Sequence, residues 1–471
     1  MIRRGSGFFF WVCLILANPA GQGWAQSSAQ PINWDAAQSE AVTLLTDYLK
    51  ADTSNPPGNE SRGVEFFKKI LEAEGIPYEA GESAPGRANL VARLKGSGRD
   101  KAIILLSHMD VVPVNQEFWS VDAFSGETRE GYVWGRGAVD MKGQGIAQLM
   151  AFLMLHRNKV PLRRDVIFLA TADEEAGGML GAGWVVREHP EWIRGAGYLL
   201  NEGARAKADE QGRPVYFGLG FTEKTPGWLR LVATGTPGHG SVPRTDSAVN
   251  RLLAALERLR TYKSPVRLTP AIERYFESVA PYEPPLNRRL KNMRESFRDP
   301  AFVAELEKVP RYAALLRNTI SITILNASKK VNVIPPVASA DVDCRLLPGV
   351  TMADWIREVK DVIGDDTIRV ETILNFSHTE SPADTPLAQT IRKVVKQNYP
   401  EAGFVFPVQT GFTDSHFFRD LGIVSYGFVP FALADAEVDR AHGNDERIPV
   451  KAFTEGVRLM WEVVYNFSKA E

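Results

Sequence analysis

The sequence predicts an α/β fold with a mixed or mostly parallel, doubly wound sheet flanked by helices. Three short apolar runs carry this prediction, at residues 103–106, 166–170 and 198–200. Short runs that are rich in Leu and β-branched residues are typical of buried parallel strands. Stretches with helical periodicity lie between them, so helices alternate with strands as a doubly wound sheet requires.

Polar side chains follow each of these apolar runs. His108 and Asp110 follow the first run, Glu174 and Glu175 the second, and Glu202 the third. A single acid after a strand is most often a helix cap or a solvated residue. Three strand ends together favour a shared site, because ligands of open α/β sheets gather beyond the carboxyl ends of the strands.

The residue types at these strand ends indicate a divalent metal. Imidazole and carboxylate ligands without thiolate favour zinc, or a neighbour such as cobalt or manganese. Once residues 1–25 are removed, Cys344 is the remaining cysteine, which excludes an internal disulfide and a cysteine cluster for metal. We expect zinc.

Residues 1–25 have the layout of a secretory signal peptide. Arg3 and Arg4 precede the apolar run at residues 8–17, and small residues lead to Ala25. The run is too short to span a bilayer. We expect cleavage near Ala25, export to the periplasm or the outside of the cell, and no stable membrane span afterwards. The alternative is an uncleaved membrane anchor.

The length of the chain indicates how many lobes it forms, and its net charge indicates which classes of molecule it binds. A chain of 471 residues predicts two or three lobes. The formal net charge of -2 provides no basic field for nucleic acid, so we expect none to bind. A small molecule or a peptide is the expected substrate.

The first lobe is predicted from helical and strand periodicity in chain order. Apolar spacing predicts helices at 35–50, 60–73 and 143–156, a strand at 90–94, and a later helix that begins at Thr385-Pro386. The Pro lies in the first helical turn, as expected. The third helix starts just after Asp140, which places this carboxylate near the strand ends.

A second lobe is predicted to begin at about Thr225, where the order of expected helices and strands changes. Residues 228–232 are expected to form a strand, residues 235–241 a glycine-rich turn, and residues 249–259 a helix that Asp246 could cap. Strand, turn and helix in this order predict a separate, smaller α+β domain.

The domain boundaries follow from composition. Residues 375–385 are polar and contain residues that interrupt helices and strands, which is typical of a connection between lobes. The second lobe is therefore expected to span residues 225–379. Residues 270–317, which are charged and helical by composition, are expected to form an extra helical insertion within it. The first lobe then comprises residues 34–224 and 380–471.

Four motifs in this order resemble the zinc-dependent M20 peptidases of the aminoacylase-1 and carboxypeptidase S type. They are Ser-His-x-Asp-Val-Val-Pro-Val at 107–114, Gly-Arg-Gly-Ala-x-Asp-Met-Lys at 135–142, Asp-Glu-Glu at 173–175 and Gly-His-x-Ser at 238–241. The resemblance runs from about residue 35 to the C-terminus. It implies a catalytic first lobe, with the second lobe as an inserted lid that often mediates dimerisation.

The resemblance also implies two zinc ions per catalytic domain. His108 and Glu202 would hold one ion, Glu175 and His442 the other, and Asp140 would bridge them. Two metal ions about 3.5 to 4 Å apart can together activate a water molecule and polarise a carbonyl.

Three further residues receive catalytic roles by the same resemblance. Glu174 would take the proton of the attacking water and pass it to the leaving amine. Asp110 would accept the second ring N–H of His108 and fix its tautomer. The lid residue His239 would stabilise the oxyanion, in some relatives across a dimer; without the resemblance it could equally be an unimportant turn residue.

Arg345 and Asn332 match positions that bind the free α-carboxylate of the substrate. A guanidinium can hold a carboxylate with two hydrogen bonds, and Asn adds one donor. Taken alone, Arg345 would more often be part of a surface ion pair.

The predicted function is a metal-dependent hydrolase that cleaves the amide bond of a peptide or N-acyl amino acid next to a free C-terminal carboxylate. The alternative is an exported relative that binds metal or peptide without catalysis. The presence of Glu174 favours the enzyme. The sequence lacks a Gly-x-Ser-x-Gly elbow and a His-Glu-x-x-His helix, which excludes two other hydrolase classes.

Overall fold

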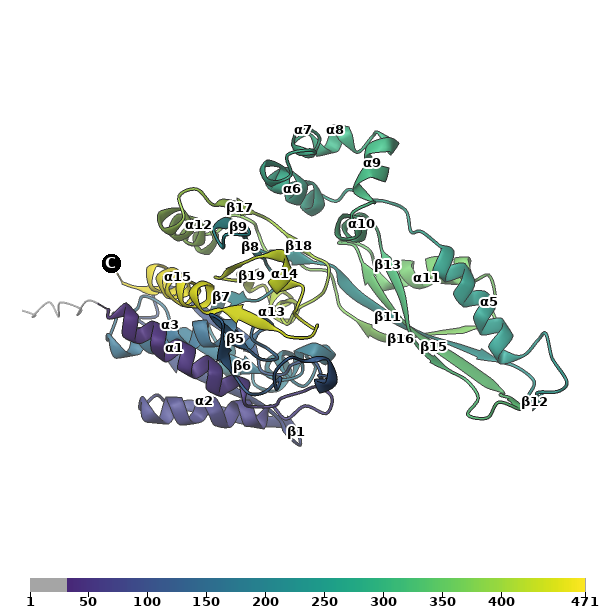
Figure 1. Ribbon diagram of the computed structural model, residues 1–471, viewed down its shortest axis with the longest axis horizontal. Coiled ribbons are helices and arrows are strands. Elements are labelled where there is room, and N and C mark those ends of the chain that lie inside the picture. The colour runs from purple at the N-terminus through teal and green to yellow at the C-terminus, as the bar shows by residue number, and fades with distance from the viewer. Residues whose placement is uncertain (1–31, 471) are drawn as a thin grey trace, which may run out of the picture. The chain divides into compact units, whose positions relative to one another are not determined.

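The computed structural model describes residues 32–470, within which the largest sheet is mixed and six-stranded. Strand β3 pairs in parallel with β6 and β7, and β7 with β19, whereas β1 with β2 and β2 with β6 are antiparallel. The prediction of an α/β fold is confirmed. In spatial order the strands are β1 (Tyr78–Ala84), β2 (Arg87–Leu94), β6 (Val166–Thr171), β3 (Ala102–His108), β7 (Ala196–Asn201) and β19 (Val424–Gly427) (Figure 1).

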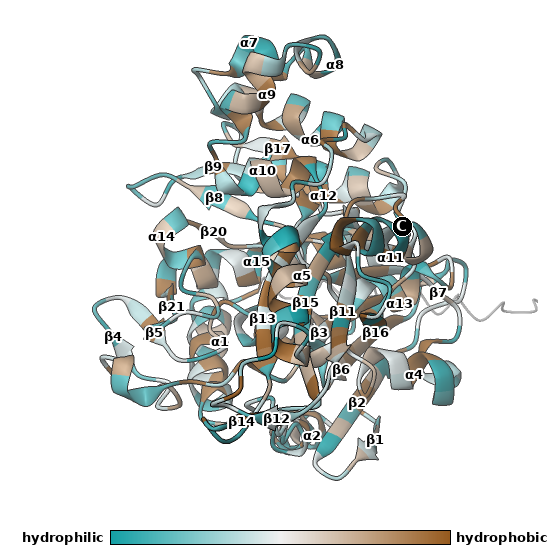
Figure 2. Ribbon diagram, turned by 90° about the vertical axis from the view of Figure 1, so that its right-hand side faces the viewer, coloured by the Kyte–Doolittle hydropathy of each residue, from teal (hydrophilic) through white to brown (hydrophobic). Residues whose placement is uncertain are grey.

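Helices cover both faces of this sheet. Every residue of β3 and β6 is buried, which explains their uninterrupted apolar sequences, and Figure 2 shows apolar colouring along these interior strands. On one face α3 packs against β3 and β6, and α1 and α15 pack against α3. The bounds are α1 (Trp34–Leu49), α2 (Ser61–Ala73), α3 (Lys142–Arg157), α12 (Pro386–Asn398) and α15 (Val450–Ser468) on that side, with α4 (Ala182–Glu188) and α13 (Ser415–Arg419) against the other.

Two glycines allow close packing at the start of α3, one against the preceding loop and one against the end of β3. A Cβ on Gly143 would lie 2.3 Å from the carbonyl oxygen of Ala138, and one on Gly145 would lie 3.1 Å from Ser107 Oγ. A side chain at Gly143 would clash with the loop before α3, and one at Gly145 would crowd the end of β3. This close approach places Asp140, just before α3, beside His108 at the end of β3.

A second, antiparallel sheet has the strand order β13-β15-β11-β16 (Figure 1). Helices α5 (Ala248–Thr261) and α11 (Met352–Ile363) pack on one face, where their apolar side chains meet those of the strands. The prediction that Asp246 caps α5 is wrong: Ser247 Oγ accepts the Asn250 N–H at 3.2 Å, while Asp246 pairs with Arg244. The strands are β11 (Thr225–Thr234), β13 (Thr319–Asn326), β15 (Val337–Leu346) and β16 (Arg369–Asn375).

Short helices occupy the chain between α5 and β13. They are α6 (Pro270–Val279), α7 (Asn287–Leu290), α8 (Met293–Ser296), α9 (Pro300–Leu306) and α10 (Pro310–Leu316). The buried Lys224 closes the C-terminal end of α10, because its Nζ donates to the carbonyls of Ala314 at 2.8 Å and Arg317 at 2.9 Å.

Smaller strands complete the description. They are β4 (Thr128–Arg129), β5 (Tyr132–Trp134), β8 (Ala206–Ala208), β9 (Pro214–Gly218), β10 (Thr222–Glu223), β12 (Gly238–His239), β14 (Val333–Ile334), β17 (Gly403–Val405), β18 (Val408–Gln409), β20 (Ala432–Leu433) and β21 (Arg447–Pro449). From Asn33 onward the chain forms one compact unit. The division into residues 34–224 with 380–471, and 225–379 with its insertion at 270–317, therefore stays a prediction.

The predicted signal peptide, residues 1–25, lies outside the described residues. Within residues 32–470, no helix is both long enough and apolar enough to cross a bilayer.

Candidate metal and catalytic site

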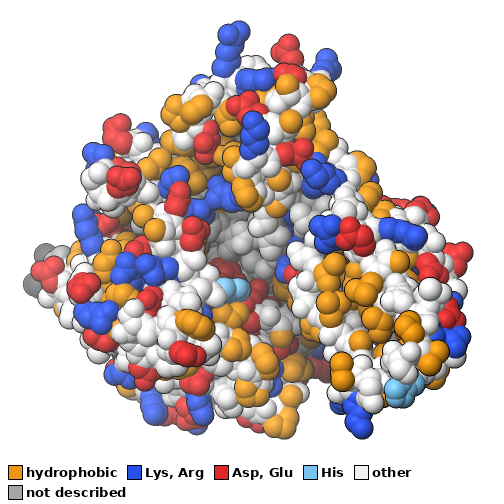
Figure 3. Space-filling model, turned by 45° about the vertical axis from the view of Figure 1, so that its right-hand side comes forward, with side chains coloured by type: hydrophobic (Ala, Val, Ile, Leu, Met, Phe, Trp, Pro, Cys, Tyr) orange, Lys and Arg blue, Asp and Glu red, His pale blue; other side chains and the backbone are white. Residues whose placement is uncertain are grey.

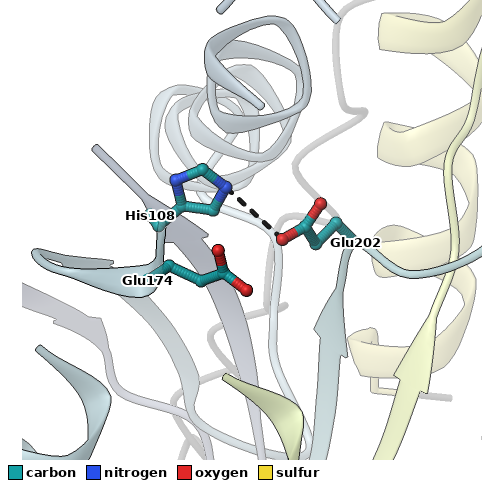
Figure 4. Close-up of side chains that lie close together, drawn as sticks. All are labelled: His108, Glu174 and Glu202. Atoms are coloured by element: carbon teal, nitrogen blue, oxygen red, sulfur yellow. Dashed lines mark ion pairs between the residues drawn. The ribbon is translucent and has the colours of Figure 1, made fainter. Parts of the chain in front are cut away.

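Two of the predicted ligands meet beyond the carboxyl ends of β3 and β7. His108 is the last residue of β3, and Glu202 follows β7 directly. The His108 Nε2 atom lies 3.3 Å from Glu202 Oε1 (Figure 4). The same Nε2 atom lies 3.2 Å from Asp140 Oδ1. The ends of two parallel strands thus deliver the imidazole of His108 and the carboxylate of Glu202, as the strand pattern predicts. The loop before α3 adds the carboxylate of Asp140.

Asp140 lies between two histidines. Its Oδ1 atom faces His108, and its Oδ2 atom lies 3.1 Å from His442 Nε2. The same His442 atom is 3.1 Å from Glu175 Oε2. The structure therefore brings together all five residues predicted as metal ligands, with Asp140 in the middle. One carboxylate whose two oxygens face different imidazoles has the arrangement that a bridging ligand needs.

Glu174 and Glu175 are carried by a turn that follows β6. Both backbone N–H groups donate to the buried Asp110 carboxylate, Glu174 to Oδ1 and Glu175 to Oδ2, each at 3.1 Å. Asn55 Nδ2 donates to the same carboxylate at 2.8 Å. The Glu174 side chain is buried beside His108 and Glu202, with ligand atoms of all three within 4.8 Å of one another (Figure 4).

His108 is oriented by Asp110, with one difference from the sequence prediction. Its Nδ1 atom donates to the Asp110 backbone carbonyl at 2.9 Å, whereas the Asp110 side-chain Oδ1 atom is 3.6 Å away. Since Nδ1 carries a hydrogen, Nε2 is the atom available to a metal. Asp110 thus orients the ring mainly through its backbone and holds the Glu174 turn through its side chain.

The electrostatics of the cluster reflect crowded buried carboxylates. Burial, followed by the charge of Asp140, raises the pKa of Glu175 to about 7. Burial also raises the pKa of Glu174 well above its usual value, and Glu202 adds to this. Burial opposes charge on His108, but its hydrogen bonds to Asp110, Asp140 and Glu202 raise its pKa well above normal.

The same crowding holds a proton on the second histidine. Hydrogen bonds to Asp140 and Glu175 raise the pKa of His442 to about 10. For Asp140, burial acts to raise the pKa, but the hydrogen bonds from His108 and His442 outweigh it and lower the value. Each imidazole is thus surrounded by negative charge that favours a cation at this point.

This donor set fits divalent metal ions. The ligands are two imidazoles and three carboxylates without a thiolate, which suits zinc, cobalt or manganese. Glu175 Oε1 is buried with no hydrogen-bond partner in the part of the chain that is described. A buried carboxylate oxygen without a partner is costly unless a cation binds there. A metal would also replace the protons that the carboxylates hold on the imidazoles.

His239 and Asn332 lie together, but the structure does not bring them to this cluster. The Gly240 N–H donates to the Asn332 carbonyl at 2.8 Å, beside the paired strands β12 and β14. His239 is exposed, and its Nδ1 atom lies 2.7 Å from Ser241 Oγ. Among residues 32–470, neither side chain has a hydrogen bond or ion pair with a cluster residue.

Arg345 is half-buried and already paired. Its Nε and NH2 atoms donate to the two Asp343 carboxylate oxygens at 2.7 and 2.9 Å. The guanidinium also lies over the rings of Trp228 and Phe412, 5.6 and 5.0 Å from their centroids. A substrate carboxylate would have to compete with Asp343 for this side chain.

Sequence reasoning missed several buried residues that support the cluster. Glu446 and Arg136 join the loops of His442 and Asp140, and Arg87 with Glu60 lies behind the Glu174 turn. Asp414 is buried near the site, where burial raises its pKa well above normal, and it accepts from Thr171 Oγ1 at 3.0 Å. All are charged residues in loops or at strand starts, which a sequence alone cannot distinguish from surface charge.

One face of the molecule is strongly hollowed (Figure 3). Figure 3 shows acidic side chains and a histidine inside a deep hollow that is rimmed by charged residues of both signs. A concave, charged site of this kind can admit a small polar substrate.

Comparison with known proteins gives a family match and relatives over most of the chain. The model described as peptidase family M20/M25/M40 matches residues 104–466. The N-fatty-acyl-amino acid synthase/hydrolase PM20D1 of Homo sapiens is 31% identical over 373 residues, covering 77% of this chain and 73% of that protein. Aminoacylase-1 of Homo sapiens is 27% identical over 427 residues, covering 89% and 93%.

Solved structures share the fold. The M20 family metallo-carboxypeptidase Sso-CP2 from Sulfolobus solfataricus superimposes with a TM-score of 0.69 at 18% identity, over 91% of this chain and 99% of that one. YXEP of Bacillus subtilis, described as a dinuclear metal binding peptidase from the M20 family, has a TM-score of 0.53 at 13% identity, over 91% and 98%.

Proposed function

This chain belongs to peptidase family M20/M25/M40, and its relatives hydrolyse amide bonds in peptides or N-acyl amino acids. We propose that it cleaves such a bond next to a free carboxylate, and that it uses two divalent metal ions. Zinc is the first candidate for both. The position of Asp140 carries this proposal, since one carboxylate faces both His108 and His442.

His108 and Glu202 would hold one metal ion, Glu175 and His442 the other, with Asp140 shared. When bound, a metal pair lowers the pKa of water and polarises the carbonyl of the substrate. The YXEP protein, which is described as binding two metals, supports the count. The donor atoms of this chain support the identity, because zinc accepts nitrogen and carboxylate ligands together.

Glu174 is the proposed general base. Burial raises the pKa of its carboxylate, which makes it a stronger base than an exposed carboxylate. As the oxygen of a water molecule bonds to the carbonyl carbon, a Glu174 oxygen accepts the proton of that water. When the C–N bond breaks, Glu174 returns the proton to the leaving nitrogen. Asp110 keeps Glu174 in place through the backbone N–H bonds described above.

The substrate is proposed to present its carboxylate to Arg345, and to Asn332 from a second copy of the chain. The relatives support an N-acyl amino acid or a peptide, and PM20D1 is described as acting on N-fatty-acyl amino acids. Arg345 can exchange its Asp343 partner for a substrate carboxylate, because a guanidinium binds either one with two parallel hydrogen bonds.

His239 and Asn332 are proposed to serve the site of a second copy of the chain. The strands and the turn around them expose apolar side chains, including Leu325, Val331 and Val337, which a homodimer would cover. Mixing inactive Glu174→Gln chains with inactive His239→Ala chains tests this. Activity should return toward a quarter of the wild-type value if His239 acts across a dimer, and stay absent if it acts within one chain.

Export is proposed from residues 1–25 alone. Expression with and without these residues, followed by N-terminal sequencing of the mature protein, should find cleavage near Ala25. An intact N-terminus would favour the anchor instead.

A hydrolysis panel tests the proposed reaction. N-acyl amino acids with short and long acyl chains, dipeptides, and the same compounds with amidated carboxyl groups are assayed with and without a chelator. Chelator-sensitive cleavage restricted to free carboxylates is expected. Binding of these compounds without turnover under every metal would favour a non-catalytic relative.

A further inference from the structure

The turn that carries Glu174 is held by side chains from distant parts of the chain. The N–H groups of four successive residues, 172–175, donate to side-chain oxygens of Asn89 at 2.9 Å, Glu60 at 3.2 Å and Asp110 at 3.1 Å twice. Strand pairing does not fix these residues, since β6 ends at Thr171. The placement of Glu174 therefore depends on these acceptors.

Asp173, just before Glu174, has a left-handed backbone with φ of 71°. A residue other than glycine is strained in this conformation and needs its surroundings to hold it there. Its carboxylate has two supports: Leu180 N–H donates to Oδ2 at 2.9 Å, and Arg87 NH2 lies 2.8 Å from Oδ1.

Arg87 connects the two carboxylates of this support. Its Nε and NH2 atoms bond to the two Glu60 oxygens at 2.8 and 2.7 Å, and NH2 also reaches Asp173. The side chains of Arg87, Glu60 and Asp173 are 10%, 0% and 7% exposed. Removing Arg87 would leave two buried carboxylates facing each other with no cation between them, which a protein interior does not tolerate without rearrangement.

We propose that Arg87 is a positioning residue for hydrolysis: through Glu60 and Asp173 it holds the left-handed turn that aims the Glu174 carboxylate at the site. This rests on the proposed function of Glu174 as general base. Arg87 has no hydrogen bond or ion pair to the five candidate ligands among the described residues. Its loss should therefore lower kcat more than it changes KM, and metal content is measured beside both because the same turn also carries Glu175.

Arg164 provides a matched control for the loss of a buried arginine. Arg164 lies just before the start of β6, and Asp173, the partner of Arg87, lies just after its end. The two arginines are thus near opposite ends of the same strand. Arg164 is 4% exposed. It donates to the Lys101 carbonyl at 3.0 Å and packs over Phe467. Its removal should cost stability without moving Glu174.

The test compares full-length Arg87→Ala, Arg87→Lys, Glu60→Gln and Arg164→Ala proteins with wild type. Metal content, kcat and KM are measured well below the lowest Tm. We expect Arg87→Ala, assayed at saturating metal, to lower kcat by about 10- to 100-fold, because small displacements of a catalytic group have effects of this size, with KM within twofold of wild type. Arg164→Ala should keep kcat within twofold. A kcat for Arg87→Ala that falls no further than that of Arg164→Ala overturns the proposal.

Two further measurements keep the result decisive. If Arg87→Ala does not fold, Arg87→Lys and Glu60→Gln should each lower kcat several-fold, and unchanged kcat in both overturns the proposal. Amide hydrogen exchange at residues 172–176 needs no substrate: it should accelerate at least tenfold in the Arg87 variants and stay unchanged in Arg164→Ala. Unaltered exchange in the Arg87 variants contradicts the proposal, whether or not the wild type is active. An inactive wild type would count against the proposed function instead.

Discussion

The carboxylate of Glu446 lies 2.6 Å from the guanidinium of Arg136, and this fully buried pair joins the two loops that carry Asp140 and His442. Glu446 also accepts the backbone N–H groups of Gly137 at 3.0 Å, Val139 at 2.8 Å and Asp140 at 3.0 Å. Because Glu446 is four residues beyond His442, it sets the separation of the two candidate ligands.

The first prediction concerns this link. Glu446→Gln should weaken metal binding about 10- to 100-fold, since residues that support ligands commonly contribute this much to affinity. Titration of metal-free protein with Zn²⁺ or Co²⁺ measures it. Glu437→Gln is the control, because Glu437 bonds to Arg447 at 2.9 and 3.0 Å in the same region without reaching the Asp140 loop. Equal affinities in both variants and wild type would remove the proposed role of Glu446.

The second prediction concerns the general base. Glu174→Gln keeps the size of the side chain but cannot accept the proton of water. We expect kcat to fall by a factor of about 10² to 10⁴, with metal content unchanged because all five candidate ligands remain. Steady-state kinetics with a substrate from the hydrolysis panel measure kcat. Activity within threefold of wild type would assign the proton transfer to another group.

The third prediction concerns metal removal. Chelation should abolish hydrolysis and lower Tm, because the buried carboxylates then face one another without a cation and metal binds the folded state alone. Added Zn²⁺, Co²⁺ or Mn²⁺ should restore both. Thermal unfolding and activity are measured on the same samples. A Tm that does not respond to chelator or to metal would mean that no ion occupies the site.

The fourth prediction concerns substrate anchoring. Arg345→Ala should raise KM about 10- to 100-fold for substrates with a free carboxylate, since a hydrogen-bonded ion pair contributes about 1.5 to 3 kcal/mol. Asp343→Asn should lower KM, because it removes the competing carboxylate at 2.7 Å. Neither change should affect amidated substrates. Equal effects on free and amidated substrates would show that Arg345 supports the fold instead.

The sequence predicts the α/β sheet and the family well, because both depend on local patterns. The fully buried strands β3 and β6 have mainly apolar sequences. His108 ends a strand, and Glu202 directly follows one. The fold and the family resemblance are both confirmed. The roles assigned to the individual site residues stay predictions.

Other features escaped prediction for physical reasons. The bonds of Arg87 to Glu60 and of Arg136 to Glu446 join residues 27 and 310 positions apart, and no local periodicity encodes such pairs. Strands such as β8, β17 and β20 have two or three residues, which is too short for an alternating pattern to be recognised. The location of His239 depends on how distant strands pair, and a glycine-rich motif does not specify that.

Anomalous X-ray diffraction from crystals of the metal-loaded protein, recorded at the absorption edge of the bound metal, tests the central claim most directly. Two peaks are predicted, both within coordination distance of Asp140, one also bound by His108 and Glu202 and the other by Glu175 and His442. Peaks elsewhere, or a fully loaded protein in which Asp140 contacts no metal, would contradict it.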